Sequence, residues 1–135
     1  MRVKDLEGNS YSWSLEGYTV DEDKRPRSEF HLTARELISR LFPTLQILEE
    51  VPIKINRGST QYLDFYLPMR KVCIEVHGQQ HYSYNSLFHS GPMGFVHQKK
   101  LDRQKIEWCD INGIGYIELK YSEQDGWEEQ LTSGV

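Results

Sequence analysis

Long hydrophobic runs are absent from this sequence. Its longest apolar stretches are only a few residues, far short of the roughly 20 that a membrane-spanning helix needs. Charged residues also interrupt the first seven positions, where a signal peptide would require an apolar segment. Low-complexity stretches are missing as well. We therefore expect a globular cytoplasmic protein that makes no membrane contact.

Cysteine is scarce, because Cys73 and Cys109 are the only two in the chain. Two cysteines cannot build a disulfide framework or a four-cysteine zinc site. This scarcity favours a reducing compartment.

Positive charge is in the minority, since 16 Lys and Arg stand against 20 Asp and Glu and the formal net charge is -4. Affinity for phosphate depends on clustered cations rather than on this sum. Basic clusters occur at residues 24–27, 70–71 and 99–105. Charge alone makes a solvated surface the simpler interpretation of these clusters.

The length of 135 residues, with 38% hydrophobic and 12% aromatic content, is that of one folded domain. Residues 1–27 read as an N-terminal extension outside the core, in which Tyr11 and Trp13 add a strand or pack on the surface. Residues 28–135 are predicted to form the domain itself.

Periodicity and turn residues predict a small mixed sheet flanked by helices, in the α/β class with an α+β mixed sheet. The core order is helix, strand, strand, strand, helix, strand. Pro52 indicates an edge strand, because proline cannot donate to a neighbouring strand. The expected elements are helices at 28–41, 94–112 and 122–131, and strands at 45–55, 62–67, 71–77 and 114–119.

The hairpin of strands 62–67 and 71–77 carries an acid on each strand. If Met69 and Arg70 form a two-residue turn, Asp64 and Glu75 stand opposite each other with Cβ atoms about 5 Å apart. Like charges so placed destabilise a hairpin unless a cation neutralises them, and Mg²⁺ is held by one or two carboxylates. The alternative is a solvated outer face.

Asp102 interrupts an apolar stripe of the helix predicted at 94–112. An acid on a buried stripe is costly unless it is paired or hydrogen-bonded. Either it forms a salt bridge with Lys99 or Lys105, or it serves a metal or a histidine. The other members of the stripe are Phe95, Ile106 and Cys109.

Two histidines, His77 and His81, follow Glu75 directly. Histidine is the side chain best suited to exchange protons near neutral pH. Cys73 with the two histidines is a conceivable zinc set, although the spacing fits no familiar zinc pattern. The sequence contains no nucleophile elbow, Walker-type loop or dinucleotide turn.

Taken together, these segments resemble the Vsr-like branch of the PD-(D/E)XK nucleases, which includes very-short-patch-repair enzymes, small endonuclease-like proteins and EDxHD homing endonucleases. The similarity covers about residues 28–120. It implies a restriction-endonuclease-like core and an endonuclease that cleaves DNA with Mg²⁺, for which Mn²⁺ substitutes. A homodimer or a partner protein is compatible with it. The segments that carry the resemblance are Leu63-Asp-Phe-Tyr-Leu-Pro68, Ile74-Glu-Val-His-Gly78, Gln80-His81, Asp102 and Asn112-Gly-Ile-Gly-Tyr-Ile-Glu-Leu119.

The resemblance also implies residue roles. Asp64 and Glu75, with the backbone carbonyl of Val76, would hold the metal. His77 stands where the wider superfamily often has a lysine, so one of the histidines would act as the general acid or base. His81 resembles the second active-site histidine, and Asp102 the aspartate that orients it.

The relatives place an acid on the first helix. At that position we expect His31 rather than Glu36, because His31 shares the inward stripe of the predicted helix.

DNA contacts would come from the basic clusters and from the loop at 82–94. Aromatic residues of that loop, Tyr82, Tyr84 and Phe88, with His89, either stack on DNA or cap the core. A catalytically inactive DNA-binding or protein-interaction domain is the alternative function, and an RNA substrate differs only in the nucleic acid. The expected phosphate contacts are Arg25, Arg27, Lys99, Lys100, Arg103 and Lys105.

Overall fold

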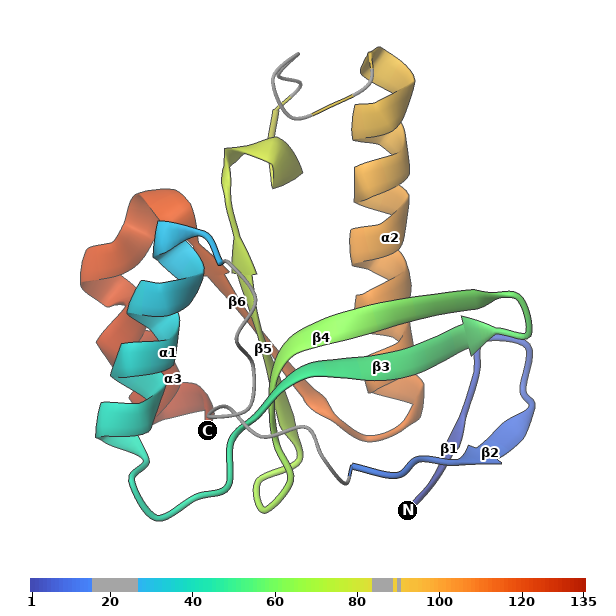
Figure 1. Cartoon of the computed structure of the whole chain (residues 1–135), viewed down its shortest axis with the longest axis horizontal. Helices are drawn as coiled ribbons and strands as arrows, with labels where there is room; N and C mark the ends of the chain where they lie inside the picture. The colour runs from blue at the N-terminus through green and yellow to red at the C-terminus, as the bar shows by residue number, and fades with distance from the viewer. Residues whose placement is uncertain (16–26, 84–88, 90) are drawn as a thin grey trace.

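The computed structural model describes residues 1–15, 27–83, 89 and 91–135, and it has an α+β fold (Figure 1). A four-stranded mixed sheet is flanked by helices, which confirms the predicted fold class. Within the described residues, no helix has both the length and the apolar character that a membrane span requires. The elements are β1 (Arg2–Lys4), β2 (Ser10–Ser12), α1 (Glu29–Leu41), β3 (Leu48–Asn56), β4 (Ser59–Leu67), β5 (Val72–His77), the 3-10 helix η2 (Gln79–His81), α2 (Pro92–Ile111), β6 (Gly115–Lys120), the 3-10 segment η3 (Tyr121–Gly126) and α3 (Trp127–Gly134).

The strand order of the main sheet is β3-β4-β5-β6. β3, β4 and β5 pair antiparallel, and β5 and β6 pair parallel with α2 as the crossover. β3 is an edge strand, as its Pro52 predicts. From α1 to β6 the elements contain the predicted order, with β1 and β2 added before it and α3 after it.

Local residues explain where α1 begins and where α2 begins and ends. The Ser28 hydroxyl accepts a hydrogen bond from the His31 backbone N–H, which caps α1 at the predicted start. α2 begins at Pro92, two residues before the expected start, because proline is favoured in the first turn. Gly113 follows the end of α2 with φ +68°, a conformation that glycine adopts without strain.

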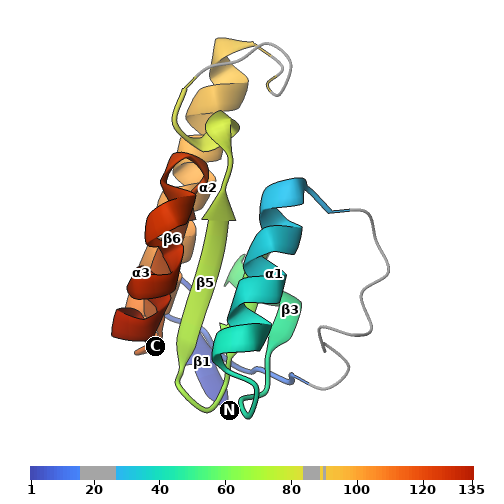
Figure 2. The same ribbon diagram turned by 90° about the vertical axis from the view of Figure 1, so that its left-hand side faces the viewer.

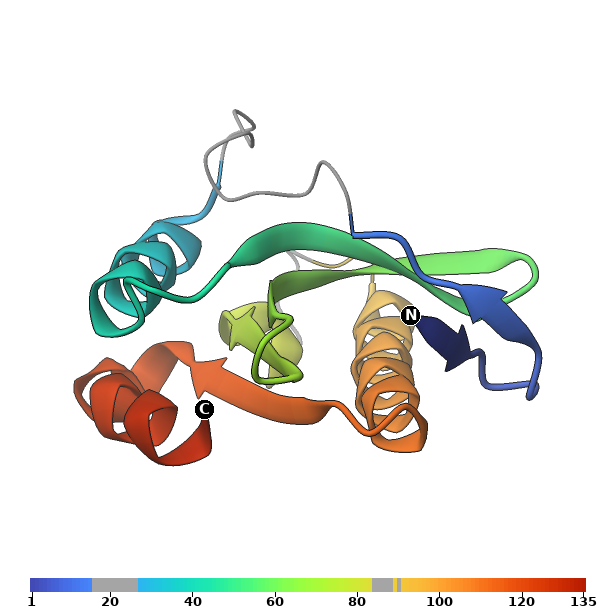
Figure 3. The same ribbon diagram turned by 90° about the horizontal axis from the view of Figure 1, so that it is seen from below.

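Two apolar clusters occupy the two faces of the sheet. α1 and α3 cover one face, and Figure 2 shows β5 with these two helices on either side of it. α2 and the N-terminal hairpin cover the other face, and Figure 3 shows α2 well apart from α1 and α3. Near the end of β4, Phe65 and Leu67 belong to the first cluster and Tyr66 to the second, as alternation predicts. Leu63 lies before the part of β4 that pairs with β5, and it belongs to the second cluster.

The described part of the N-terminal segment belongs to the core, so the prediction that residues 1–27 lie outside it is wrong there. β1 and β2 pair antiparallel. Trp13 is 4% exposed, packs against Tyr66 and Trp108 at ring-centroid distances of 4.9 and 5.0 Å, and donates its indole N–H to the Pro52 carbonyl. Residues 16–26 lie outside the described part of the chain.

Trp13→Ala is expected to lower the free energy of unfolding by about 3 kcal/mol, because it leaves a large cavity between two aromatic rings. Tyr62→Ala, at a side chain that is 49% exposed, is expected to change it by less than about 0.5 kcal/mol. Urea denaturation of the two variants measures the difference. Equal effects would show that the N-terminal segment contributes nothing to the core.

Candidate functional site

The site forms where β4 separates from β5. Backbone pairing of the two strands runs from Leu67 opposite Val72 to Phe65 opposite Ile74. This confirms the predicted register, although the connecting loop has four residues rather than two. Beyond the last pair the β3–β4 hairpin swings away from β5 (Figure 1). The next residue on each strand is an acid, Asp64 or Glu75.

The two acids bridge the separating strands. The Asp64 backbone N–H donates to Glu75 Oε2 at 2.5 Å, and the Val76 backbone N–H donates to Asp64 Oδ2 at 2.9 Å. Glu75 is 1% exposed, so the alternative of a solvated outer face is wrong for it. Where the strands have separated, each carboxylate accepts a backbone N–H that would otherwise pair with a backbone carbonyl of the neighbouring strand. These hydrogen bonds hold both side chains in place.

Charge in this pair is only partly compensated. Burial and the neighbouring Glu75 raise the pKa of Asp64 from 3.8 to about 7, and burial also raises the pKa of Glu75. Lys105 Nζ lies 2.7 Å from Glu75 Oε1. Burial alone would lower the pKa of Lys105, but Glu75 and Asp64 raise it overall, so this amine stays charged. One lysine therefore faces two carboxylates.

Lys105 reaches the site because the inner face of α2 differs from the predicted stripe. Asp102 and Cys109 are buried as expected, but Ile106 is 45% exposed. Lys105 takes the inward position, three residues after Asp102 and four before Cys109, so the stripe keeps helical spacing. The buried Glu75 carboxylate accounts for this rotation, because it requires a cation.

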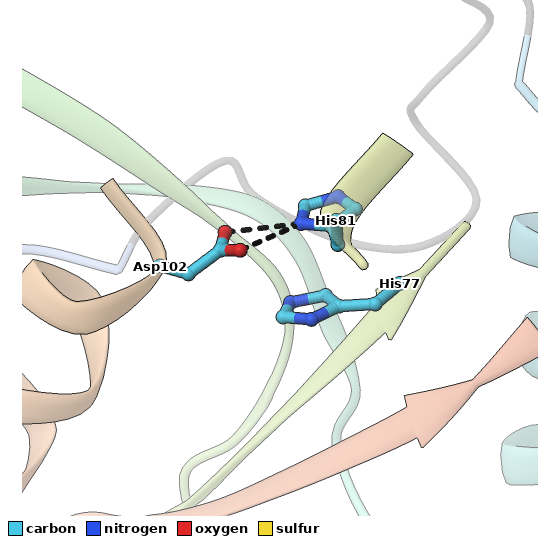
Figure 4. Close-up of side chains that lie close together, drawn as sticks. All are labelled: His77, His81 and Asp102. Carbon is cyan, nitrogen blue, oxygen red and sulfur yellow. Dashed lines mark hydrogen bonds and ion pairs between the residues drawn. The ribbon is translucent and has the colours of Figure 1, made fainter. Parts of the chain in front are cut away.

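His77, His81 and Asp102 come from β5, η2 and α2, and their side chains lie close together (Figure 4). The imidazole rings of the two histidines stack with centroids 4.0 Å apart and planes at 7°. His81 Nδ1 lies 3.0 Å from both carboxylate oxygens of Asp102, which also accepts a hydrogen bond from Gln98. Of the two roles predicted for Asp102, the structure has the contact with a histidine and not the lysine salt bridge.

The two histidines differ in environment. Burial, together with His81, lowers the pKa of His77 from 6.5 to about 3, so this imidazole is neutral at physiological pH. The hydroxyl of Tyr116 lies 3.4 Å from its Nε2. For Asp102, burial alone would raise the pKa, but the hydrogen bond and charge of His81 lower it overall. His81 is therefore hydrogen-bonded to an anionic partner, whereas the Glu118 carboxylate lies 2.6 Å from His77 Nδ1 without a hydrogen bond.

His31 points inward, as predicted, and is 6% exposed. Its ring stacks on Phe65 at 4.7 Å, and its Nε2–H contacts the Glu49 carboxylate. Burial alone would raise the pKa of Glu49, but hydrogen bonds from His31 and Arg35 lower it overall. Glu36 is exposed on α1 and lines a separate hollow near α3, so it is not at the site.

Glu49 and Glu50 are residues of the site that the sequence reasoning missed. The flanking pairs of β3 and β4 place Glu50 opposite Asp64. Glu50 has φ +53°, which is strained for a residue other than glycine, and such strain concentrates at functional sites. Its carboxylate accepts a hydrogen bond from Arg27 at 2.6 Å. Two consecutive acids beside the apolar residues of this strand were the available signal.

A pocket of about 260 Å³ brings most of the predicted catalytic residues together. Asp102 does not line the pocket itself, but it contacts His81, which does. Cys73 does not line the pocket, because its thiol is buried in the core beside Cys109. Among the described residues His77 and His81 group with Asp102 and not with Cys73, so the zinc set that included Cys73 is wrong. The pocket is lined by Arg27, Ser28, His31, Glu50, Asp64, Glu75, Val76, His77, Gln80, His81 and Lys105.

Of the other basic residues predicted to contact DNA, the three that the structure describes do not line this pocket. Lys99 Nζ lies over the rings of Tyr82 and Phe95, at 5.2 and 5.8 Å from their centroids. Lys100 and Arg103 are exposed on α2. Three residues expected to contact DNA fall outside the described part of the chain, namely Arg25, Tyr84 and Phe88.

The raised pKa of Asp64 predicts a pH-dependent stability. Between about pH 4 and 7 the folded chain holds a proton on Asp64 that the unfolded chain has released, so stability is lost as the pH rises through this window. Asp64→Asn removes this penalty. The melting temperature of the variant, measured relative to wild type, is therefore expected to increase from pH 4 to pH 8. A difference in melting temperature between variant and wild type that stays constant over this pH range would contradict the prediction.

Comparison with known proteins gives three viral relatives. The chain is 33% identical over 129 residues to uncharacterized protein 307L of Invertebrate iridescent virus 6, which covers 83% of the chain and 66% of the relative. It is 38% identical over 71 residues to uncharacterized protein 094L of Frog virus 3, covering 52% of the chain and 46% of the relative. With uncharacterized protein 033L of Invertebrate iridescent virus 3 it shares 31% identity over 65 residues, covering 48% of the chain and 34% of the relative.

The chain thus spans between about a third and two thirds of the length of these relatives. No protein-family model and no solved structure matches it.

Proposed function

We propose that this chain is a metal-dependent DNA endonuclease related to the Vsr-like and EDxHD branch of the PD-(D/E)XK superfamily. The observation that carries the proposal is the pair Asp64 and Glu75, which are fixed against each other at the point where β4 and β5 separate. An uncharged amide oxygen could accept the same backbone hydrogen bonds, so the fold does not require a charge at either position. Burying Glu75 with the partly buried Asp64 beside it costs stability, and a site that binds a cation explains that cost.

The donor set fits Mg²⁺, with Mn²⁺ as a substitute. Mg²⁺ is held by one or two carboxylates and otherwise by water and substrate phosphate, and the two acids open into a pocket of about 260 Å³ that has room for those ligands. Asp64 and Glu75 would be the protein carboxylates. When bound, the ion supplies charge stabilisation at the phosphoryl oxygens and lowers the pKa of a coordinated water.

The chain's own residues would handle the proton and the charge. In hydrolysis a water oxygen forms a bond to phosphorus while the bond to the leaving oxygen breaks, and a proton must move in this exchange. We assign the transfer of that proton to His81, because Asp102 holds the His81 imidazole in place. His77 is a poor candidate, since its pKa of about 3 makes it a weak base. Lys105 would provide a fixed positive charge beside the phosphate.

Cations around the pocket would hold the nucleic-acid backbone. Arg27 lines the pocket itself, and Lys100 and Arg103 are exposed on α2, the helix that supplies Asp102 and Lys105. Phosphate contacts of this kind position a duplex without reading its sequence.

A plasmid assay tests the proposal. The full chain is incubated with supercoiled plasmid and Mg²⁺, and nicked or linear products are followed on a gel. We expect cleavage that EDTA abolishes and Mn²⁺ restores. Binding to DNA without cleavage under any divalent metal would replace this proposal with an inactive DNA-binding domain, and cleavage of RNA alone would change the substrate.

A further inference from the structure

The proposed hydrolysis leaves His77 without a role, although this histidine is costly to bury. Its side chain is 2% exposed. Within the described residues its Nδ1 makes no hydrogen bond, although the Glu118 Oε1 atom lies 2.6 Å away in an orientation that a hydrogen bond does not allow. A buried imidazole whose Nδ1 makes no hydrogen bond calls for an explanation, and metal binding by the ring supplies one.

A second and a third ligand stand beside it. His77, His81 and Asp102 each offer one ligand atom, and these atoms all lie within 4.8 Å of one another. Figure 4 shows both imidazoles turned toward the Asp102 carboxylate. A tetrahedral zinc ion holds its donors roughly 3.3 Å apart, so small side-chain rotations close the group around one ion.

We propose that His77, His81 and Asp102 form a second metal site, which binds Zn²⁺ through two imidazoles and one carboxylate and leaves a fourth position open.

Zinc fits this donor set better than Mg²⁺ does. Two nitrogen ligands with one carboxylate and an open position are typical of zinc, whereas Mg²⁺ prefers oxygen donors. With Nε2 as the ligand atom, a small rotation of the ring would let Nδ1 donate to the Glu118 carboxylate beside it, the arrangement found for acids behind zinc-bound histidines.

Occupation of this site would stop the proposed hydrolysis, a consequence that rests on the proposed function. Zinc would bind His81, to which we assign the proton transfer, and Asp102, which holds its imidazole in place. Zn²⁺ added to a Mg²⁺ reaction is therefore expected to inhibit nicking, while Asp64 and Glu75 remain free for Mg²⁺.

Titration of the metal-free protein with Co²⁺, which reports tetrahedral sites by visible absorption, tests the site without DNA. We expect a visible band that one equivalent of Zn²⁺ removes. The band should persist in Asp64→Asn and disappear in His77→Ala and Asp102→Asn. Glu118→Gln, which keeps all three ligands, should weaken Co²⁺ affinity by roughly tenfold and covers the case in which His77→Ala fails to fold.

Absence of the band from the wild-type protein, or its loss in Asp64→Asn with retention in His77→Ala, would overturn the site. A near-ultraviolet thiolate band would overturn it as well, because it would assign the metal to Cys73 or Cys109. A Co²⁺ band with the expected variant pattern in a protein that cleaves no DNA would keep the site and remove the nuclease, so the two proposals fail separately.

Discussion

Asp64→Asn is expected to reduce plasmid nicking about a thousandfold while raising the melting temperature of the protein. The activity falls because an amide is a poor ligand for Mg²⁺, and losing the charge stabilisation of the metal is worth several kcal/mol in the transition state. The stability rises because Asp64 no longer repels Glu75, and the new amide oxygen can still accept the Val76 N–H. The opposite directions of the two effects separate a functional acid from a structural one.

Asp110→Asn is the matched control, because it makes the same change at an exposed acid on α2. It should leave both nicking and melting temperature unchanged. Initial rates at saturating Mg²⁺ and calorimetric melting measure the two quantities. Full activity in Asp64→Asn, or a loss of activity explained by unfolding, would remove the assignment of Asp64.

His81→Ala is expected to slow nicking by at least about a hundredfold, because general acid–base catalysis by one positioned side chain contributes between about 10² and 10⁴. Its contact with Asp102, and not its burial alone, distinguishes it from His77. Mn²⁺ binding at Asp64 and Glu75 should stay unchanged, since His81 does not bond to either acid.

His97→Ala provides the control for that variant, because His97 is an exposed histidine on α2. Its nicking rate should equal that of wild type. Single-turnover rates isolate the chemical step from product release. Equal nicking rates in His81→Ala and His97→Ala would show that a group other than His81 transfers the proton.

The hairpin at the centre of the site was predictable because its information is local. Alternation fixes which residues of two short strands share a face, and the register is the predicted one although the loop has four residues rather than two. Continued by one residue on each strand, this register places Asp64 beside Glu75. The capped start of α1 and the inward position of His31 follow from helical spacing in the same way. The role of Asp102 toward a histidine was also among the alternatives that the sequence offered.

Features set by tertiary contacts were not predictable in this way. Lys105 and Ile106 are adjacent on α2, and only the buried Glu75 decides which of them turns inward. Glu50 joins the site because β3 has an irregular residue opposite Asp64, which no propensity signals. Trp13 is buried in the core next to the N-terminal hairpin. Its sequence neighbours are polar, so no apolar pattern in the sequence indicates this burial.

A crystal of the protein soaked with Mn²⁺ tests the central claim most directly. Anomalous scattering at the manganese edge locates the ion without reference to activity. We predict a peak in the pocket between the Asp64 and Glu75 carboxylates, roughly 2 Å from an oxygen of each. Ordered, ion-free carboxylates at saturating Mn²⁺, or a peak confined to the histidines, would contradict the account.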